Sequence, residues 1–240
     1  MVPEEQTAEP PISSQGDVFT RLYRLRDPTA TEVILVRHGE PTPADRQATV
    51  YDPPLSERGR WQARRLAARL APLRLDALYS SPLKRALQTA QPLAEATGLE
   101  IREVPELREV EMDLARLRSL SQRLGREALI EELGRRLLAT PRWDMLPGFE
   151  PSHRFRHRVL RAMQEIVSRH PGGRVVVVCH GGVINIYLGR VLGIRSRDIF
   201  FLPEFTSLTV VRVAGERAVV QTVGDYAHLA AEGGEIFTAP

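Results

Sequence analysis

Short β-branched segments alternate with longer amphipathic segments from Glu32 onward, and this order constrains the fold more than any other feature of the chain. The segments EVILV, DALYS, EIREV and RVVVV are separated by stretches in which apolar residues recur at three- and four-residue steps. Strands that alternate with helices are typical of parallel sheets, because each parallel pair needs a crossover connection. We therefore predict an α/β domain with three layers, α/β/α, around a mostly parallel sheet.

Capping residues place two of the predicted helices. Ser56 is a candidate N-cap. Ser81 and Pro82 predict the cap and first position of the next helix, Gly98 predicts its end, and Pro92 predicts a kink within it. The first of these helices carries an apolar stripe that consists of Ala63, Leu66, Ala67, Leu70 and Leu73.

The remaining segments define the domain organisation. Residues 112–140 form two amphipathic stretches divided near Gly125, which we interpret as a helical insertion. The continuous valines of RVVVV predict a central strand that is buried on both faces, and the runs LTVVRV and AVVQTV predict a terminal hairpin. We predict a partly mobile N-terminal arm over residues 1–30, one domain over 31–230 and a tail over 231–240.

Composition excludes several classes of protein. The chain of 240 residues has a net charge of +3, and its single cysteine excludes an internal disulfide and a cysteine-built metal centre. No apolar run approaches the ~18 residues of a membrane span, and no secretory signal is recognisable, which predicts a cytoplasmic protein with no membrane partner. Arginine and glutamate alternate and aromatic residues make up 6%, so no nucleic-acid partner is expected.

Basic side chains follow the ends of three predicted strands. Arg37 and His38 come directly after EVILV, and His180 comes after RVVVVC. Arg85 lies in the first turn of the helix that follows DALYS. Ligands of open α/β sheets bind beyond the carboxyl ends of the strands, where helix N-termini also favour anions. Two arginines, two histidines and a helix start therefore predict a phosphate site.

Three segments in this order resemble the histidine phosphatase superfamily, which is also called phosphoglycerate mutase-like. They are R-H-G-E after a strand, S-S-P-L-K-R-A-L-Q-T-A at a helix start, and V-V-C-H-G-G after a later strand. P-P-L-S-E-R-G, L-R-E and D-Y-A-H-L are further matches. The resemblance covers residues 32–230 and implies the phosphoglycerate mutase-like fold.

The resemblance also implies covalent catalysis through a phosphohistidine. It makes His38 the nucleophile, with Arg37 and Arg85 holding the phosphoryl oxygens and His180 stabilising charge during the transfer. Glu109 of L-R-E is implied as the proton donor to the leaving group. These roles agree with phosphoryl-transfer chemistry, in which positioned cations stabilise charge on the equatorial oxygens.

Backbone groups complete the predicted phosphate site. A neutral imidazole at His38 needs an acceptor for its other nitrogen, and a carbonyl near Gly39 is the candidate. Gly39 and Gly181 are expected to let backbone approach the anion closely. His153 and His157 have no third ligand nearby, so neither a metal ion nor another cofactor is expected.

The chain departs from the family pattern at three places, one of which is the A-T-V-Y-D stretch before P-L, where the family usually has Q-G-x-x-D. Pro41 and Ala44 replace the threonine and asparagine that usually follow R-H-G-E, which removes one donor to the phosphate. The glycine and tryptophan that usually follow L-R-E are absent, so Glu106 and Glu111 remain alternatives to Glu109 as the acid.

We conclude from the sequence that the chain is a metal-independent phosphomonoester hydrolase of the histidine phosphatase type, acting on a small phosphorylated metabolite. A cofactor-dependent phosphoglycerate mutase is the alternative, and a non-catalytic module that binds a phosphorylated ligand is the third interpretation. We expect the insertion at 112–140 to form a lid that selects the substrate. The resemblance is also compatible with a homodimer.

Overall fold

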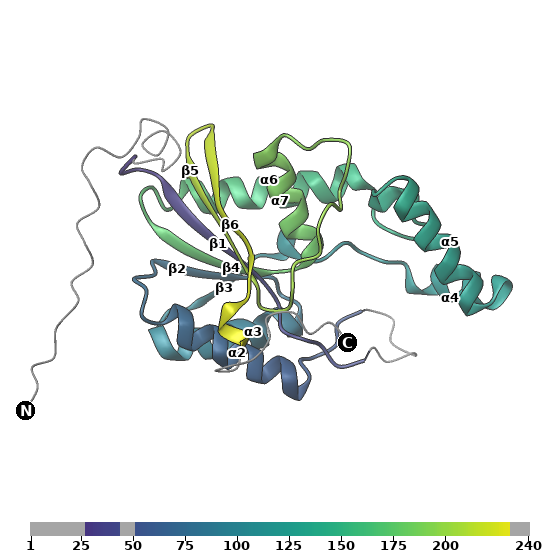
Figure 1. The fold of residues 1–240 in the computed structure, drawn as a ribbon, viewed down its shortest axis with the longest axis horizontal. Coiled ribbons are helices and arrows are strands. Elements are labelled where there is room, and N and C mark those ends of the chain that lie inside the picture. The colour runs from purple at the N-terminus through teal and green to yellow at the C-terminus, as the bar shows by residue number, and fades with distance from the viewer. Residues whose placement is uncertain (1–26, 44–50, 231–240) are drawn as a thin grey trace, which may run out of the picture.

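A six-stranded mixed sheet forms the centre of the molecule (Figure 1). The computed structural model describes residues 27–43 and 51–230. The strands, in the spatial order β3-β2-β4-β1-β5-β6, are β1 (Thr31–Arg37), β2 (Ala77–Ser80), β3 (Ile101–Glu103), β4 (Arg174–Cys179), β5 (Leu208–Ala214) and β6 (Arg217–Asp225). The first four strands of this order are parallel, and β5 and β6 form the predicted antiparallel hairpin. The predicted α/β fold with a mostly parallel sheet is confirmed. Nearly all of the predicted arm and the whole tail lie outside the described residues.

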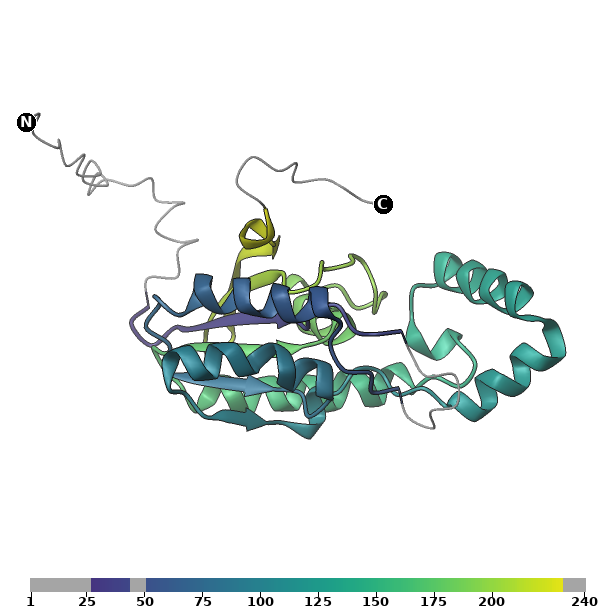
Figure 2. The same ribbon diagram turned by 90° about the horizontal axis from the view of Figure 1, so that it is seen from below.

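Helices cover both faces of the sheet, as Figures 1 and 2 show. On one face lie α2 (Glu57–Leu70) and α3 (Lys84–Thr97), and on the other lie α6 (Ser152–Ser168) and α7 (Gly181–Leu192). Side chains of β1 alternate between the two layers: Ile34 and Val36 pack with α2 and α3, whereas Val33 and Leu35 pack with α6 and α7. Residues 33–36 of this strand are all apolar because both of its faces are buried there.

The pairing of β1 with β4 brings the two predicted histidines to one edge of the sheet. The two strands are parallel neighbours, with Arg37 opposite Cys179 at their carboxyl ends. The N–H of His38 donates to the Cys179 carbonyl at 2.9 Å. β2 flanks the other side of β4, and the N–H of Ser81 donates to the Val178 carbonyl. Three chain segments therefore leave the sheet at the same place.

Local capping agrees with the sequence at one helix and differs at the next. The Ser56 hydroxyl accepts the Gly59 N–H at 3.0 Å, as predicted for α2. The prediction that Ser81 and Pro82 start α3 is wrong, because this helix begins at Lys84 and its N-cap has no side-chain hydrogen bond.

Two further details of these helices can be compared with the sequence. α3 continues through Pro92 to Thr97, and Gly98 ends it in a left-handed conformation as predicted. The prediction for Leu73 is wrong, because this residue lies beyond the end of α2 and is 39% exposed rather than part of its buried stripe.

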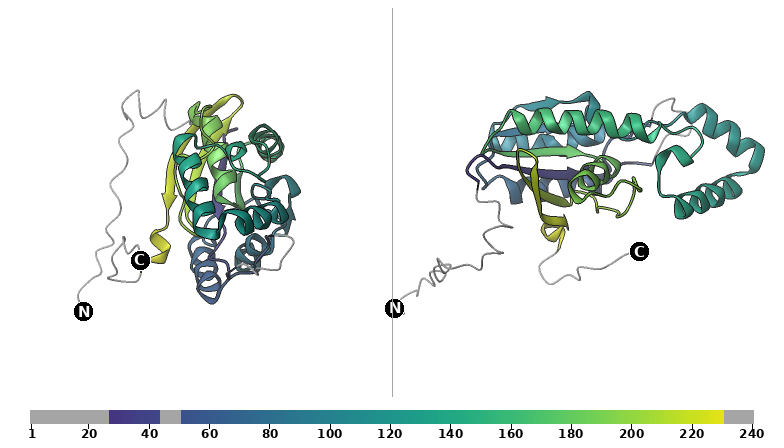
Figure 3. Two further views of the ribbon diagram at one scale, coloured as in Figure 1. Left: turned by 90° about the vertical axis from the view of Figure 1, so that its right-hand side faces the viewer. Right: turned by 90° about the horizontal axis from the view of Figure 1, so that it is seen from above.

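The predicted helical insertion is present and projects from the domain beyond the carboxyl ends of the parallel strands (Figures 2 and 3). It consists of α4 (Leu114–Leu124) and α5 (Arg126–Ala139), joined at Gly125. No residue of α4 is buried, and Leu129 is the buried residue of α5. The leucines of α4 are therefore not part of the buried core. Three short 3-10 helices, η1 (Pro105–Leu107), η2 (Trp143–Met145) and η3 (Ala227–Leu229), complete the described elements. No helix in the described ranges has the length and apolar content needed to cross a membrane.

Candidate active site

His38 lies at the end of β1 and is 6% exposed. Its Nδ1 is 2.7 Å from the Gly39 carbonyl oxygen, so the N–H at this nitrogen donates to the backbone. Nε2 then carries the lone pair and lies 3.2 Å from Nε of Arg85. The predicted carbonyl acceptor is therefore that of Gly39, and this contact sets the tautomer of the imidazole.

Arg85 contacts His38 from the first turn of α3. The side chain is 2% exposed, and its NH1 group donates to the Tyr51 carbonyl at 3.3 Å. Asp52 lies 3.9 Å from the same NH1 group. The neighbouring Lys84 is exposed, so Arg85 is the basic side chain of this helix that reaches the histidine.

Arg37 is held from the loop that precedes β5. Its NH1 group donates to the Pro203 carbonyl at 2.6 Å, and its guanidinium lies 4.1 Å from the centroid of the Phe205 ring. Its Nε is buried and has no hydrogen-bond partner among the described residues. Glu40 does not pair with it, because Glu40 accepts from Ser56 and lies near Arg58. Arg37 therefore keeps donor capacity for an anion.

His180 stands beside His38, with 5.1 Å between the ring centroids and an angle of 58° between the planes. It is fully buried, and its Nε2 lies 2.8 Å from the Ser81 hydroxyl. Its Nδ1 has no partner among the described residues. Ser81 thus contacts a site histidine instead of capping α3.

Both histidines are neutral near pH 7. Burial lowers the pKa of His38 to about 3, and the adjacent Arg85 and Arg37 add to this effect. Burial also lowers the pKa of His180 well below its ordinary value, and His38 and Arg85 act in the same direction. A neutral imidazole keeps a lone pair at Nε2, which here accepts from Nε of Arg85, so His38 has the electron pair that a nucleophile needs.

Glu109 lies at the N-terminus of α7. Its Oε2 accepts from the Gly182 N–H at 3.1 Å, and its Oε1 accepts from the Val110 N–H at 3.0 Å. A Cβ at position 182 would lie 2.3 Å from Oε1, so a larger residue there would displace the carboxylate from this position. Burial lowers the pKa values of Arg37 and Arg85, and the charge of Glu109 opposes this effect, so the carboxylate lies within electrostatic range of both guanidinium groups.

The two alternative acids are engaged elsewhere. Glu106 lies 3.6 Å from Arg161, and Glu111 lies 3.0 Å from Arg108 with 59% of its side chain exposed. Arg158 was not predicted from the sequence, and it binds the carbonyls of 106, 108 and 109. This arginine holds the backbone on which Glu109 sits, and its position within an arginine-rich helix gave no signal of that role.

The two predicted glycines have different surroundings. The N–H of Gly39 donates to the Thr89 hydroxyl at 2.9 Å, and a Cβ at this position would lie 2.8 Å from the Gly59 carbonyl oxygen. Gly39 therefore permits close packing against the start of α2 and orients His38 through its carbonyl. Gly181 starts α7 beside Arg37, where a Cβ would lie 4.0 Å from Nε.

Sequence reasoning also missed a contact between the C-terminal segment and the site. Thr206 adopts a left-handed conformation with φ of 58°, and its N–H donates to the Arg37 carbonyl at 3.0 Å. Its hydroxyl lies 3.0 Å from Nε2 of His228, within the D-Y-A-H-L segment. Of the departures noted in the sequence, Pro41 pairs with Leu55, and Ala44 lies outside the described residues. The described residues contain no group of three or more metal-ligating side chains.

The family profile of the histidine phosphatase superfamily (branch 1) matches residues 33–226. The chain belongs to this superfamily. Histidine phosphatases similar to it include phosphoserine phosphatase 1 of Hydrogenobacter thermophilus, at 33% identity over 82% of this chain and 94% of that protein. The metal-independent phosphoserine phosphatase of Arabidopsis thaliana is 32% identical over 85% of each chain.

Other similar proteins carry different names. The probable phosphoglycerate mutase GpmB of Cronobacter sakazakii is 30% identical over 82% of this chain and 94% of that protein. Among solved structures, Bacillus stearothermophilus YhfR has a TM-score of 0.67 and 28% identity, and the match covers 83% of this chain and 99% of that one. Proteins named as phosphatases and a protein named as a probable mutase are thus both similar to this chain.

Proposed function

We propose that this histidine phosphatase is a metal-independent phosphomonoesterase that hydrolyses a small phosphorylated metabolite through a phosphohistidine at His38. The observation that carries the proposal is that the two nitrogens of the His38 ring have different partners. Nδ1 donates to the Gly39 carbonyl, and Nε2 accepts from Nε of Arg85. The lone pair of Nε2 is thereby directed toward the place where two arginines and His180 converge.

In the first step, Arg37 and Arg85 hold the phosphoryl oxygens and Nε2 of His38 attacks phosphorus. The bond between phosphorus and the ester oxygen breaks, and its electron pair leaves with that oxygen. Glu109, in its protonated form, donates a proton to the leaving group and becomes a carboxylate. The buried His180 and the arginines stabilise the charge that spreads over the equatorial oxygens.

In the second step, water attacks the phosphorus of phospho-His38. The Glu109 carboxylate accepts a proton from this water, and the bond between phosphorus and Nε2 breaks. Inorganic phosphate leaves, the imidazole is neutral again, and Glu109 is protonated as at the start. One residue thus serves as acid and then as base.

Two arginines supply the cationic charge that this chemistry requires. The guanidinium group is planar, remains charged and can bind two oxygens at once. We therefore expect hydrolysis to continue in the presence of EDTA.

The substrate beyond its phosphate is expected to meet the insertion formed by α4 and α5, which projects at the end of the sheet where His38 lies (Figure 2). The two similar phosphoserine phosphatases make phosphoserine the first metabolite to assay. Sugar phosphates and phosphoglycerates belong in the same screen.

A phosphoglycerate mutase is the second candidate, and the similarity to the protein named GpmB favours it. A mutase must keep phospho-His38 from water and return the phosphoryl group to a bound intermediate. Conversion of 3-phosphoglycerate that depends on bisphosphoglycerate, without release of phosphate, would replace the first proposal by this one.

The test is phosphate release from p-nitrophenyl phosphate and from phosphoserine, with EDTA present, for the wild type and His38→Ala. We expect chelator-resistant turnover that disappears in the variant. Turnover that needs an added metal would contradict the proposal. Absence of turnover in every assay, combined with tight binding of inorganic phosphate, would favour a non-catalytic binding module.

A further inference from the structure

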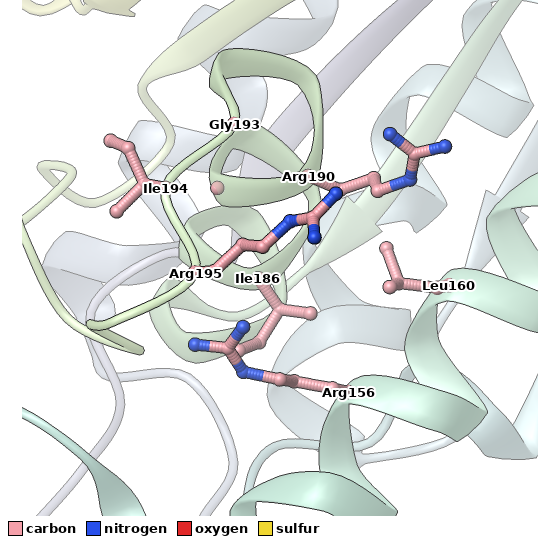
Figure 4. A pocket seen from close by; sticks show the side chains of 8 residues that line it. Arg156, Leu160, Ile186, Arg190, Gly193, Ile194 and Arg195 are labelled. Atoms are coloured by element: carbon pink, nitrogen blue, oxygen red, sulfur yellow. The ribbon is translucent and has the colours of Figure 1, made fainter. Parts of the chain in front are cut away.

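A second pocket lies near the end of α7 that is farther from His180, between this helix and α6 (Figure 4). Its volume of about 380 Å³ falls within the range of small-molecule sites. α7 has 12 residues, so a helix of about 18 Å separates its two ends. The pocket is lined by Arg156, Leu160, Ile186, Gly189, Arg190, Gly193, Ile194 and Arg195.

The lining combines an apolar wall with a basic rim. Ile186 is 4% exposed and Leu160 is half-buried, and both point into the space between the arginine side chains (Figure 4). The guanidinium groups of Arg156, Arg190 and Arg195 stand around this apolar wall. No acidic residue lines the pocket.

Two of the three guanidinium groups are not neutralised. Arg190 and Arg195 are exposed and make no hydrogen bond or ion pair with the described residues. Single arginines of this kind are common at protein surfaces. Here, however, they border one apolar cavity together with a third arginine, so the cavity has an excess of positive charge.

The third arginine is fixed in place. Nε of Arg156 donates to Oδ1 of Asp198 at 2.6 Å, and its NH2 group donates to the Arg197 carbonyl at 2.8 Å. Asp198 is fully buried and also accepts from the Ser152 hydroxyl and the Trp143 N–H. Arg156 therefore holds its guanidinium in one orientation and forms a fixed part of the pocket wall.

We propose that this pocket binds a small organic anion, with a carboxylate or phosphate group attached to an apolar body, at a site separate from the phosphate pocket. The anionic group pairs with Arg190 and Arg195, whose forked donors fit carboxylate and phosphate oxygens. The apolar body contacts Leu160 and Ile186. An anionic group alone would leave the apolar wall without a contact, and an apolar body alone would leave the arginines without a partner. The proposed ligand therefore carries both.

The test uses 1-naphthoate as the probe and isothermal titration calorimetry as the measurement. We expect it to bind the wild type more tightly than acetate, which lacks the apolar body, and than 1-naphthalenemethanol, which lacks the charge. A second titration uses 1-naphthylmethylphosphonate. The difference in its Kd between the wild type and the pocket variant shows whether the pocket also accepts a phosphate-like group.

The pocket variant is Arg190→Gln with Arg195→Gln, and its matched control is Arg64→Gln with Arg74→Gln. All four side chains are exposed, and the control removes the same charge elsewhere on the chain. We expect the Kd for 1-naphthoate to rise about tenfold or more in the pocket variant and to stay unchanged in the control. Hydrolysis of p-nitrophenyl phosphate should remain in both variants.

Three results would overturn the proposal. They are the absence of binding to the wild type, equal binding to the pocket variant, and inhibition competitive with p-nitrophenyl phosphate that persists in that variant. The last result would place the probe in the phosphate pocket. None of them bears on whether His38 catalyses hydrolysis, so the two proposals can fail separately.

Discussion

At the scale of single residues, the three carboxylates near L-R-E differ in what they contact. Glu109 accepts the N–H groups of Gly182, at the start of α7, and of Val110, and its charge acts on Arg37 and Arg85. Glu106 and Glu111 pair with arginines outside the site. The sequence placed all three within six positions and could not separate them, because the separation depends on the loop that Arg158 anchors.

Replacing Glu109 by glutamine tests its assignment as the acid. We expect kcat for an alkyl phosphate such as phosphoserine to fall by about 10²–10⁴, since the poor leaving group needs a proton. The decrease for p-nitrophenyl phosphate should be much smaller, because nitrophenolate leaves without one. Glu111→Gln is the matched control and should leave both rates unchanged. Equal losses on the two substrates in Glu109→Gln would show that the residue does not act as a proton donor.

At the scale of elements, the sequence was most informative where a pattern reflects burial. The alternation of strands and helices predicted the helical layers on both faces of the sheet, and the valines of β4 identified a central strand that is buried on both faces. It was least informative where a tertiary contact competes with a local one. Ser81 contacts His180 and does not cap α3. The spacing of Leu73 places it on the apolar stripe of α2, but the helix ends at Leu70.

The residues of the site also divide into those that the sequence pattern predicts and those that depend on tertiary contacts. His38, Arg85 and His180 could be predicted because strand ends and a helix start fix their positions relative to the sheet. Phe205 and Thr206 could not, since they approach Arg37 from a loop before β5 whose path the sequence does not indicate. Thr206 also requires a left-handed conformation that is uncommon for threonine, which no local pattern predicts.

Deletion of the insertion tests its role at this scale. Replacing residues 114–138 by a short Gly-Ser linker removes α4 and nearly all of α5, of which Leu129 alone is buried. We expect the domain to fold and kcat/KM for p-nitrophenyl phosphate to stay within about threefold of the wild type, because this substrate depends on the phosphate site alone. The ranking of metabolites in a phosphatase screen should change. An unchanged ranking in a folded deletion variant would contradict a role in substrate selection.

At the scale of the whole molecule, buried histidines connect stability to pH. Burial lowers the pKa of His38 to about 3, that of His228 to about 4, and that of His180 well below its ordinary value. In the unfolded chain each returns to about 6.5. The unfolded state therefore binds more protons as the pH falls through 6.5. The stabilisation is fully present above that pH and declines below it until the folded pKa of each histidine is reached.

Urea unfolding at several pH values between 7 and 5.5 measures this effect. Near the lower end of the window each histidine contributes a slope that approaches about 1.4 kcal/mol per pH unit, so the free energy of unfolding should decrease with falling pH. His228→Asn should remove the contribution of one histidine to this slope, which approaches about 1.4 kcal/mol per pH unit, while leaving His38 in place. A free energy of unfolding that does not change over this window would contradict the account of the buried histidines.

The homodimer compatible with the family resemblance stays a prediction.

The measurement that tests the central claim most directly is chemical trapping of the intermediate. A rapid alkaline quench during the first turnover, followed by peptide mapping, locates any phosphoryl group on the chain. We expect it on Nε2 of His38 in the wild type, with EDTA present, and nowhere in His38→Ala. Phosphate release without a phosphorylated His38 peptide, or a phosphoryl group on another side chain, would contradict catalysis through this histidine.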